Sequence, residues 1–492
     1  MQEPRPPAAP VIAGGIAADE PVAAETGRAI LAAGGSAADA IVAATFALAV
    51  TYPGAASLGG GGICLAHDAG KLETTAFEFL ARAARPAGGA AVAAVPGMAR
   101  GMAALHARFG LRDWASLLLP AERLARDGYQ VSRALASELS ATPALLADPA
   151  ARRLFAGADG RPIGEGERLR QPELAATIRA LRSGRGASDL YSGATAARLL
   201  EDSAAAGRPL AAEELRGYSV VARPAEQRPY GVHSLAFTGA SPQGGVRAAE
   251  LTLLLAQELS WAGAGEAAQA HMFAEAAALV AEGVAAPGED RLPRLARAFD
   301  RARHRPVAAS GRVVEQPSAT GLVAVDYFGQ AVACAFTLNA PFGSAKLGAR
   351  TGILLAAAPE PDGRSVDALG ALMLVNRNTG NVFFGAAAAG GSAAPAAIAR
   401  VALETLEAKR SLKDALAAPR ILPAGASDTL WVEPELAPAT RAGLAARGHR
   451  LAEAGALGHA VAFYCPEGVP RQPRCEVEAD PRWFGLALTV VD

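Results

Sequence analysis

The stretch that decides the fold runs from Pro317 to Gly343 and reads PSATGLVAVDYFGQAVACAFTLNAPFG. It begins with small and hydroxyl-bearing residues. Two apolar runs follow, Leu322–Val325 and Ala331–Leu338, and the turn between them at Asp326–Gln330 is typical of a β-hairpin. Asn339 comes directly after the second run. A hydroxyl at the head of one strand would then lie beside an amide at the end of the next, a pattern that favours an acyl-transfer site.

Composition limits the classes of protein that fit. Hydrophobic residues make up 51% of the 492 residues and charged residues only 19%, so a large buried core is easy to form. No linker divides the chain, and we expect one domain over residues 1–492. The net charge is -1 without a basic block, which excludes nucleic acid as the expected partner. No apolar run is long enough to span a membrane. Since no secretory signal is visible, we expect a cytoplasmic protein, or a periplasmic one if a leader has been removed.

The cysteines and histidines give weaker signals. Cys64 and Cys334 sit in apolar runs and are expected to be buried free thiols. Cys465 and Cys475 bracket a loop rich in proline and glycine, and the sequence leaves open whether they form a disulfide.

None of the seven histidines has the spacing of a metal motif such as HExxH, so neither a metal nor another cofactor is expected.

The N-terminal part predicts two helices, Pro21–Ala33 and Ala37–Val50, the second almost wholly apolar apart from Asp39 and therefore buried. Gly59–Gly62 then precede a strand, Ile63–His67. A phosphate-binding loop requires a helix after its glycines, so we interpret these glycines as a turn with close backbone contacts.

Further along, residues 148–169 are predicted to be a surface excursion, and residues 351–359 and 371–387 are predicted to be strands, the latter as a hairpin through Asn378–Gly380. Gly244–Gly245 begin a helix, where close packing is expected. Paired strands separated by long helices indicate sheets covered by helical layers.

Several stretches together resemble the γ-glutamyltransferases (γ-glutamyl transpeptidases), which are N-terminal-nucleophile hydrolases, and the likeness extends over essentially the whole chain. These stretches occur in the family's order: PVAAETGRAILAAGGSAADAIVAATFALAV (21–50), SLGGGG (57–62), SPQGGV (241–246), FGQAVACAFTLNAPFGS (328–344), AGGS (389–392), DALAAPR (414–420) and ADPR (479–482).

The resemblance implies an α+β fold, a four-layer αββα sandwich. It also implies that the chain cuts itself before a Thr, giving a large-subunit region, 1–318, and a small-subunit region, 319–492. The freed α-amino group, which titrates near pH 8, would activate the Thr hydroxyl. If the site is active, the expected partner is a small-molecule substrate; the sequence leaves open whether the chain forms a homo-oligomer or is a subunit of a larger complex.

Aligning the motif puts Ala319 at the nucleophile position and Thr320 at the position of the family's second Thr. Alanine has no hydroxyl, so three explanations stay open: Thr320 serves after a shift of the cut by one residue, Ser318 serves, or the site is inactive, by nature or by a deliberate substitution. Thr337 and Asn339 match the residues that support the nucleophile. Gly390 and Gly391 match the oxyanion-hole glycines, as the resemblance implies.

The residues that would hold a glutamate head group depart from the family. The family's carboxylate-binding Arg falls near Leu80, with Arg82 two positions later. The acid that binds the α-amine has only Glu360 or Asp362 as offset candidates, and the family's paired serines have no counterpart in VDALGALML. Ordinary glutathione turnover is therefore not expected, because a zwitterionic head group needs a cation and an anion placed opposite each other.

Two classes of function follow from the sequence. The first is acyl transfer or hydrolysis of a small γ-glutamyl-type amide, with Thr320 as the nucleophile after cleavage. The alternative is an uncleaved, catalytically inactive paralogue that acts as a structural or assembly subunit or as a small-molecule binding protein.

Overall fold

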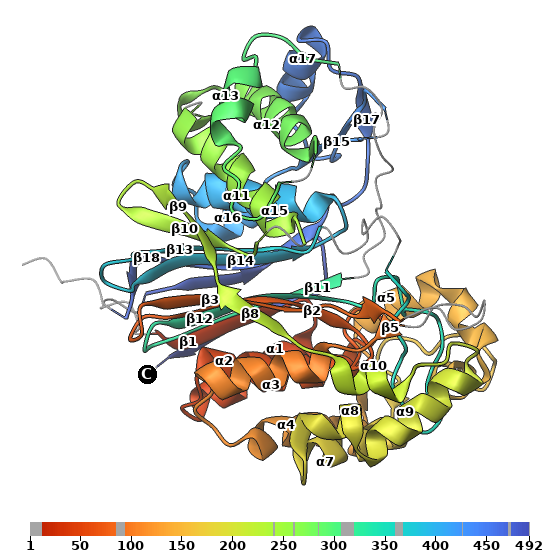
Figure 1. The fold of residues 1–492 in the computed structure, drawn as a ribbon. Helices are drawn as coiled ribbons and strands as arrows, with labels where there is room; N and C mark the ends of the chain where they lie inside the picture. The colour runs from red at the N-terminus through yellow and green to blue at the C-terminus, as the bar shows by residue number, and fades with distance from the viewer. Residues whose placement is uncertain are drawn as a thin grey trace, which may run out of the picture.

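Two β-sheets lie face to face in the middle of the molecule, and helices cover the outer side of each (Figure 1). The computed structural model describes residues 12–84, 94–239, 242–258, 261–283, 285–306, 319–359, 368–425, 427–470 and 474–491. Its order of helices, sheet, sheet and helices is the four-layer αββα sandwich of the α+β class that was predicted.

The first sheet has seven strands and contains the hairpin that begins at residue 319. In spatial order its strands are β20 (Leu486–Val491), β1 (Ile12–Ala18), β11 (Ala319–Asp326), β12 (Gln330–Thr337), β2 (Gly61–Asp68), β3 (Glu73–Phe79) and β8 (Val221–Pro224).

The second sheet has six strands and includes the predicted hairpin of residues 371–387. In spatial order they are β19 (Glu476–Ala479), β18 (His459–Val469), β14 (Val382–Ala389), β13 (Ala371–Val375), β10 (His233–Phe237) and β9 (Glu226–Tyr230).

Below the seven-stranded sheet in Figure 1 lies the N-terminal helical layer. It comprises α1 (Pro21–Ala32), α2 (Ala37–Thr51), α3 (Met98–Phe109), α4 (Trp114–Asp127), α5 (Arg133–Ala141), α6 (Pro149–Phe155), α7 (Pro172–Arg182), α8 (Asp189–Ser192), α9 (Ala194–Ala205) and α10 (Ala212–Gly217). Two short ladders accompany these helices, β4 (Arg82–Ala83) with β5 (Ala94–Val95) and β6 (Tyr129–Gln130) with β7 (Arg168–Leu169).

Above the six-stranded sheet lies the second helical layer, with a small three-stranded sheet at its outer end (Figure 1). The helices are α11 (Gly244–Leu253), α12 (Glu266–Ala281), α13 (Leu292–Ala298), α15 (Ala393–Leu406), α16 (Leu412–Ala417) and α17 (Pro438–Ala446), and the strands are β15 (Ile421–Pro423), β16 (Leu430–Val432) and β17 (Leu451–Glu453). Among the described residues, no helix is both long enough and apolar enough to cross a lipid bilayer.

Helix α2 forms where the sequence predicts it, and its ends and burial have clear causes. Ser36 is the N-cap: its hydroxyl accepts from the Asp39 backbone N–H, and the Asp39 carboxylate accepts from the Ser36 N–H. This capping box satisfies two N–H groups that the helix itself cannot pair. Every residue from Ala37 to Thr51 is buried, as expected for a helix that is apolar on all sides.

The glycine run 59–62 is a site of close backbone approach, which confirms its structural interpretation. A Cβ added at Gly61 would lie 2.2 Å from the Phe79 carbonyl oxygen, and one at Gly60 would lie 2.5 Å from the Thr337 carbonyl oxygen. Only glycine permits such contacts. The loop thereby packs directly against the end of β12.

One prediction of local structure is wrong. Residues 351–359 were predicted to be a strand, but they form only isolated bridges, such as the pair Leu347–Leu354. Their carbonyl groups accept hydrogen bonds from the loop before them, for example Leu355 O from the Ser344 N–H and Ile353 O from the Gly348 N–H. The predicted surface excursion at residues 148–169 is confirmed for residues 157–167, most of which are exposed; it lies between α6, which Asp148 caps with its side chain, and β7.

All four cysteines are paired in the structure, so the prediction that Cys64 and Cys334 are free thiols is wrong. These two residues are direct neighbours in the antiparallel register of β2 and β12, and they form a disulfide. Cys465 and Cys475, left open by the sequence, form the second disulfide. The pairing of residues 270 positions apart depends on the order of strands in the sheet, which local sequence does not reveal.

We expect Gly61→Ala to lower the free energy of unfolding by about 1–3 kcal/mol, because the added Cβ meets the fixed backbone of the neighbouring strand. Gly217→Ala is the matched control, since nothing lies within 4 Å of a Cβ added there. Urea denaturation of the two variants and the parent chain measures the difference. A Gly61→Ala protein as stable as the control would contradict the close packing of this loop.

Candidate functional site

The predicted site begins at Ala319, the first residue of β11. Ala319 is the direct partner of Thr337 in the register of β11 and β12. Residues that are direct partners in an antiparallel pair project to the same face of the sheet. Ala319 is 6% exposed and belongs to the apolar cluster between the two sheets, together with Val323 and Val325. The structure therefore places residue 319 on the inner face, beside Thr337.

Thr320 lies on the opposite face of the same sheet. Side chains alternate along a strand, and Leu322 and Ala324, which share the face of Thr320, belong to the apolar cluster under the N-terminal helices. Thr320 is fully buried. Its hydroxyl donates a hydrogen bond to Asp19 Oδ2 at 3.0 Å. Ala319, at the expected nucleophile position, and Thr320, a candidate replacement for it, therefore lie on opposite faces of the sheet.

Asp19 holds Thr320 within a cluster of buried polar side chains. Its Oδ2 also accepts from the Gly321 backbone N–H at 2.7 Å and lies 3.2 Å from His459 Nε2. The His459 ring stacks on Trp483, with centroids 5.0 Å apart and the planes 10° from parallel. Burial lowers the pKa of His459, but Asp19 and Asp480 outweigh that effect and raise it above its ordinary value. Asp19 therefore joins the start of β11 to the end of β1, and its contact with His459 adds the start of β18.

Asn339 lies two residues after the end of β12 and has a left-handed conformation, with φ of 67°. Its backbone N–H donates to Thr337 Oγ1 at 2.9 Å, and its side-chain Nδ2 donates to the Ala357 carbonyl at 2.8 Å. Within the described ranges, Asn339 Oδ1 is buried with no hydrogen-bond partner. Phe342 and Ala345 are also left-handed, and such strained backbone gathers at functional loops. Thr337 and Asn339 thus lie at the end of β12 that pairs with Ala319, and their role in supporting a nucleophile stays a prediction.

Gly390 and Gly391 connect β14 to helix α15. Both have positive φ, 119° and 59°, and a Cβ on Gly390 would meet Gly458 Cα at 2.5 Å. Ala389, the residue before them, lies in the same inter-sheet cluster as Ala319. The glycine pair therefore continues a strand that packs against the inner face of β11, and its oxyanion role stays a prediction.

Of the predicted substrate-binding residues, Arg82 alone lies in the described part of the chain. Arg82 is exposed, and its guanidinium lies 5.1 Å from the centre of the Tyr218 ring. Leu80, at the position of the family's Arg, packs against the inter-sheet cluster. Ser318, Glu360 and Asp362 lie outside the described residues.

A second buried carboxyl group lies behind the loop that follows Asn339. Glu138 accepts a hydrogen bond from the Tyr52 hydroxyl at 2.7 Å, and its Oε2 is close to Gly54, beside Phe342. Burial raises the pKa of Glu138 to about 8, against a smaller lowering by the Tyr52 hydrogen bond. Glu138 is therefore protonated in the folded protein at neutral pH.

The family model described as Gamma-glutamyltranspeptidase matches residues 23–489 of the chain. The chain belongs to this family.

Individual relatives agree with that assignment. The glutathione hydrolase proenzyme of Escherichia coli (strain K12) is 25% identical over 512 aligned residues, which cover 90% of this chain and 87% of that protein. The glutathione hydrolase proenzyme of Bacillus subtilis (strain 168) is 28% identical over 255 residues, but the match spans only 47% of this chain and 43% of that protein. Cephalosporin acylase from Bacillus halodurans has the same fold, with a TM-score of 0.80 at 20% identity over 99% of this chain and 98% of that one.

Asp19 and His459 are the site residues that the sequence did not reveal in this γ-glutamyltranspeptidase-family chain. Asp19 lies two residues before Pro21, next to Glu20, the N-cap of α1, and His459 is an isolated histidine in the sequence. Thr320 lies 301 positions from Asp19, so only the pairing of β1 with β11 brings them together.

We expect stability to fall as the pH rises from about 5 to 8, and Glu138 is one cause. Its folded pKa of about 8 exceeds the ordinary value of 4.5, so over this range the folded state keeps a proton that the unfolded state has lost. The loss is up to about 1.4 kcal/mol per pH unit. Unfolding curves for the parent and for Glu138→Gln, measured across this range, isolate the effect. Parallel pH dependences for the two proteins would contradict the raised pKa.

Proposed function

We propose that this γ-glutamyltranspeptidase-family chain stays uncleaved and acts as a structural or assembly subunit without nucleophilic catalysis at β11. The observation that carries the proposal is that the adjacent side chains of Ala319 and Thr320 project to opposite faces of β11. The methyl group of Ala319 faces the inter-sheet space opposite Thr337, and the hydroxyl of Thr320 faces the helices, bonded to Asp19. A methyl group cannot attack an amide carbon.

Moving Thr320 to the inner face would require a large rearrangement. A slip of one residue in β11 sends every side chain of the strand to the other face. Leu322 would then leave the cluster under the helices, and Asp19 would lose the hydroxyl and N–H groups that it binds. Buried carboxylates without partners are costly. The native register therefore disfavours Thr320 as a replacement nucleophile.

The surroundings of the inner face also support a role without glutamyl turnover. Leu80 packs where the family places a cation for the substrate carboxylate, and Arg82 is turned outward onto Tyr218. An apolar side chain at this position cannot balance the charge of a carboxylate. The chain therefore keeps the family's scaffold but has no cation at residue 80 to bind the carboxylate of a glutamyl substrate.

One observation favours a second candidate, acyl transfer or hydrolysis of a small γ-glutamyl-type amide by Thr320. The Thr320 hydroxyl already donates to a carboxylate, Asp19 Oδ2, at 3.0 Å. That carboxylate could accept the proton as the hydroxyl attacked, in the way that a general base activates a nucleophile. This candidate requires that a substrate reach a fully buried hydroxyl.

The purified chain should run on denaturing electrophoresis as one band near 49.8 kDa, because no hydroxyl occupies position 319. Two fragments that meet near residue 319 would contradict the proposal. Mass spectrometry of the first residue of the smaller fragment would then choose among Ser318, Ala319 and Thr320. Stabilisation by a small amide without turnover would instead indicate a binding protein.

We expect Ala319→Thr to permit self-cleavage, because the change adds a hydroxyl beside Thr337, and Asn339 Oδ1 is a buried acceptor without a hydrogen-bond partner among the described residues. The matched control is Ala319→Val, which has the shape of Thr without its hydroxyl. Fragment formation over hours, followed by electrophoresis, should occur in the Thr variant alone. If the Thr variant folds and stays whole, position 319 is not the nucleophile position.

A further inference from the structure

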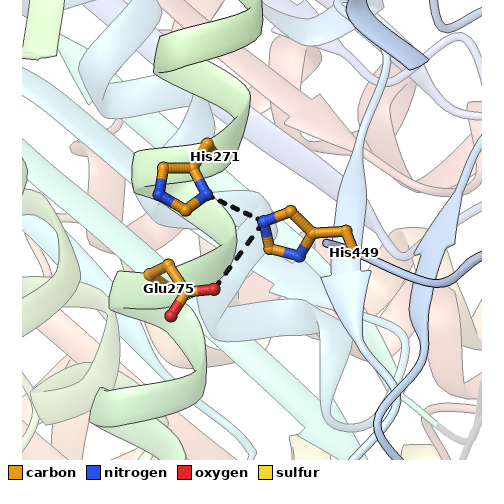
Figure 2. A group of neighbouring side chains, drawn as sticks. All are labelled: His271, Glu275 and His449. Carbon is orange, nitrogen blue, oxygen red and sulfur yellow. Dashed lines mark hydrogen bonds and ion pairs between the residues drawn. The ribbon is translucent and has the colours of Figure 1, made fainter. Parts of the chain in front are cut away.

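A cluster of histidine and carboxylate side chains lies in the outer part of the second helical layer. Figure 2 shows His271 and Glu275 on one face of α12, both directed toward His449, which follows α17. Residues four apart in a helix lie one above the other. All three side chains are buried, with exposures of 0%, 4% and 6%. In Figure 1 these helices lie above the six-stranded sheet, on the other side from β11.

The ligand atoms of the three residues converge. His271 Nδ1 and His449 Nε2 are 2.8 Å apart, and His449 Nε2 is 3.7 Å from Glu275 Oε1. All three atoms lie within 4.8 Å of one another. Atoms bound to one zinc ion at about 2.0–2.2 Å lie roughly 3–4 Å apart. Small rotations of the rings bring the set to that spacing.

We propose that His271, Glu275 and His449 bind a divalent transition metal ion, with Zn²⁺ as the best match. Two imidazoles and one carboxylate are a ligand set that zinc takes in proteins, and the three leave a fourth position for water or another side chain. The ion would join α12 to the segment after α17, residues 178 positions apart in sequence.

The residues around the cluster orient the carboxylate as an outer shell would. His304 Nδ1 is 2.6 Å from Glu275 Oε1, and its Nε2 is 2.8 Å from Asp428 Oδ1. The Arg305 backbone N–H donates to Glu275 Oε2 at 3.1 Å. Hydrogen bonds of this kind fix the direction of ligating groups in metal sites.

The electrostatics of the cluster agree with this arrangement. Burial lowers the pKa of His271, and burial together with the nearby His304 and His271 lowers the pKa of His449 to about 4. The lowered pKa values favour the neutral imidazole, which is the form that binds metals. His304 donates to the carboxylates of Glu275 and Asp428, because each of its ring nitrogens faces a carboxylate oxygen. Burial lowers the pKa of His304, but Glu275 and Asp428 raise it above its ordinary value overall.

The competing arrangement is a metal-free network in which His271 and His449 share one proton. Zinc affinity distinguishes the metal site from the metal-free network, because a pair of histidines that share a proton binds zinc no more tightly than surface histidines do.

The test is a zinc titration of the full-length, tag-free chain after treatment with EDTA, followed by calorimetry and by metal analysis of the dialysed protein. We expect one zinc per chain, with affinity at least 10-fold lower in His449→Gln and in Glu275→Gln. His304→Gln should lose about 10–100-fold, as outer-shell changes do. His233→Gln, on β10 and remote from the cluster, is the matched control and should bind as the parent does.

Cobalt provides a measurement that needs no variant. Co²⁺ added to the parent chain should give visible absorption bands of a four- or five-coordinate nitrogen and oxygen site, and Zn²⁺ should displace them. Sub-stoichiometric zinc, or equal affinity in the parent and the Glu275→Gln and His449→Gln variants, would overturn the proposal. If those variants fail to fold, the absence of the cobalt bands in the parent would overturn it.

Discussion

The alternation of side chains along β11 is the constraint on which the site depends. Ala319 projects between the two sheets and Thr320 projects toward the helices, and the strand cannot present both to one face. Asp19 fixes this choice, because one carboxylate oxygen binds the Thr320 hydroxyl and the Gly321 N–H and pairs with His459. The start of β11, the end of β1 and the start of β18 are thereby held together at one point.

The inner face of β11 is a closely packed contact between sheets. A Cβ on Gly321 would lie 2.9 Å from Val461 Cγ2 and 3.4 Å from the Ala387 carbonyl oxygen. Ala319 and Ala389 belong to the same cluster. Small residues let the two backbones approach, so the interface gains dispersion contacts that a larger side chain would disrupt. The small side chain of Ala319 fits this packed face.

Sequence patterns predicted several elements of the fold well, because each element is determined by residues that are close together in the sequence. The capped, apolar α2 and the glycine run at 59–62 follow from the properties of those residues alone, and the hairpin at 319–337 follows from its turn. Contacts between distant segments were not predictable in the same way. The Cys64–Cys334 pair depends on which strands are neighbours, and the bond between Thr320 and Asp19 depends on the pairing of β1 with β11. The cluster of His271 and His449 was missed because spacing rules examine one segment at a time.

The most direct measurement of the central claim is a crystal structure of the purified chain at a resolution that shows the side chains of β11. The account predicts the Ala319 methyl group between the sheets beside Thr337, and the Thr320 hydroxyl within hydrogen-bond distance of Asp19. A Thr320 hydroxyl that projects into the inter-sheet space, next to Thr337 and Asn339, would contradict it.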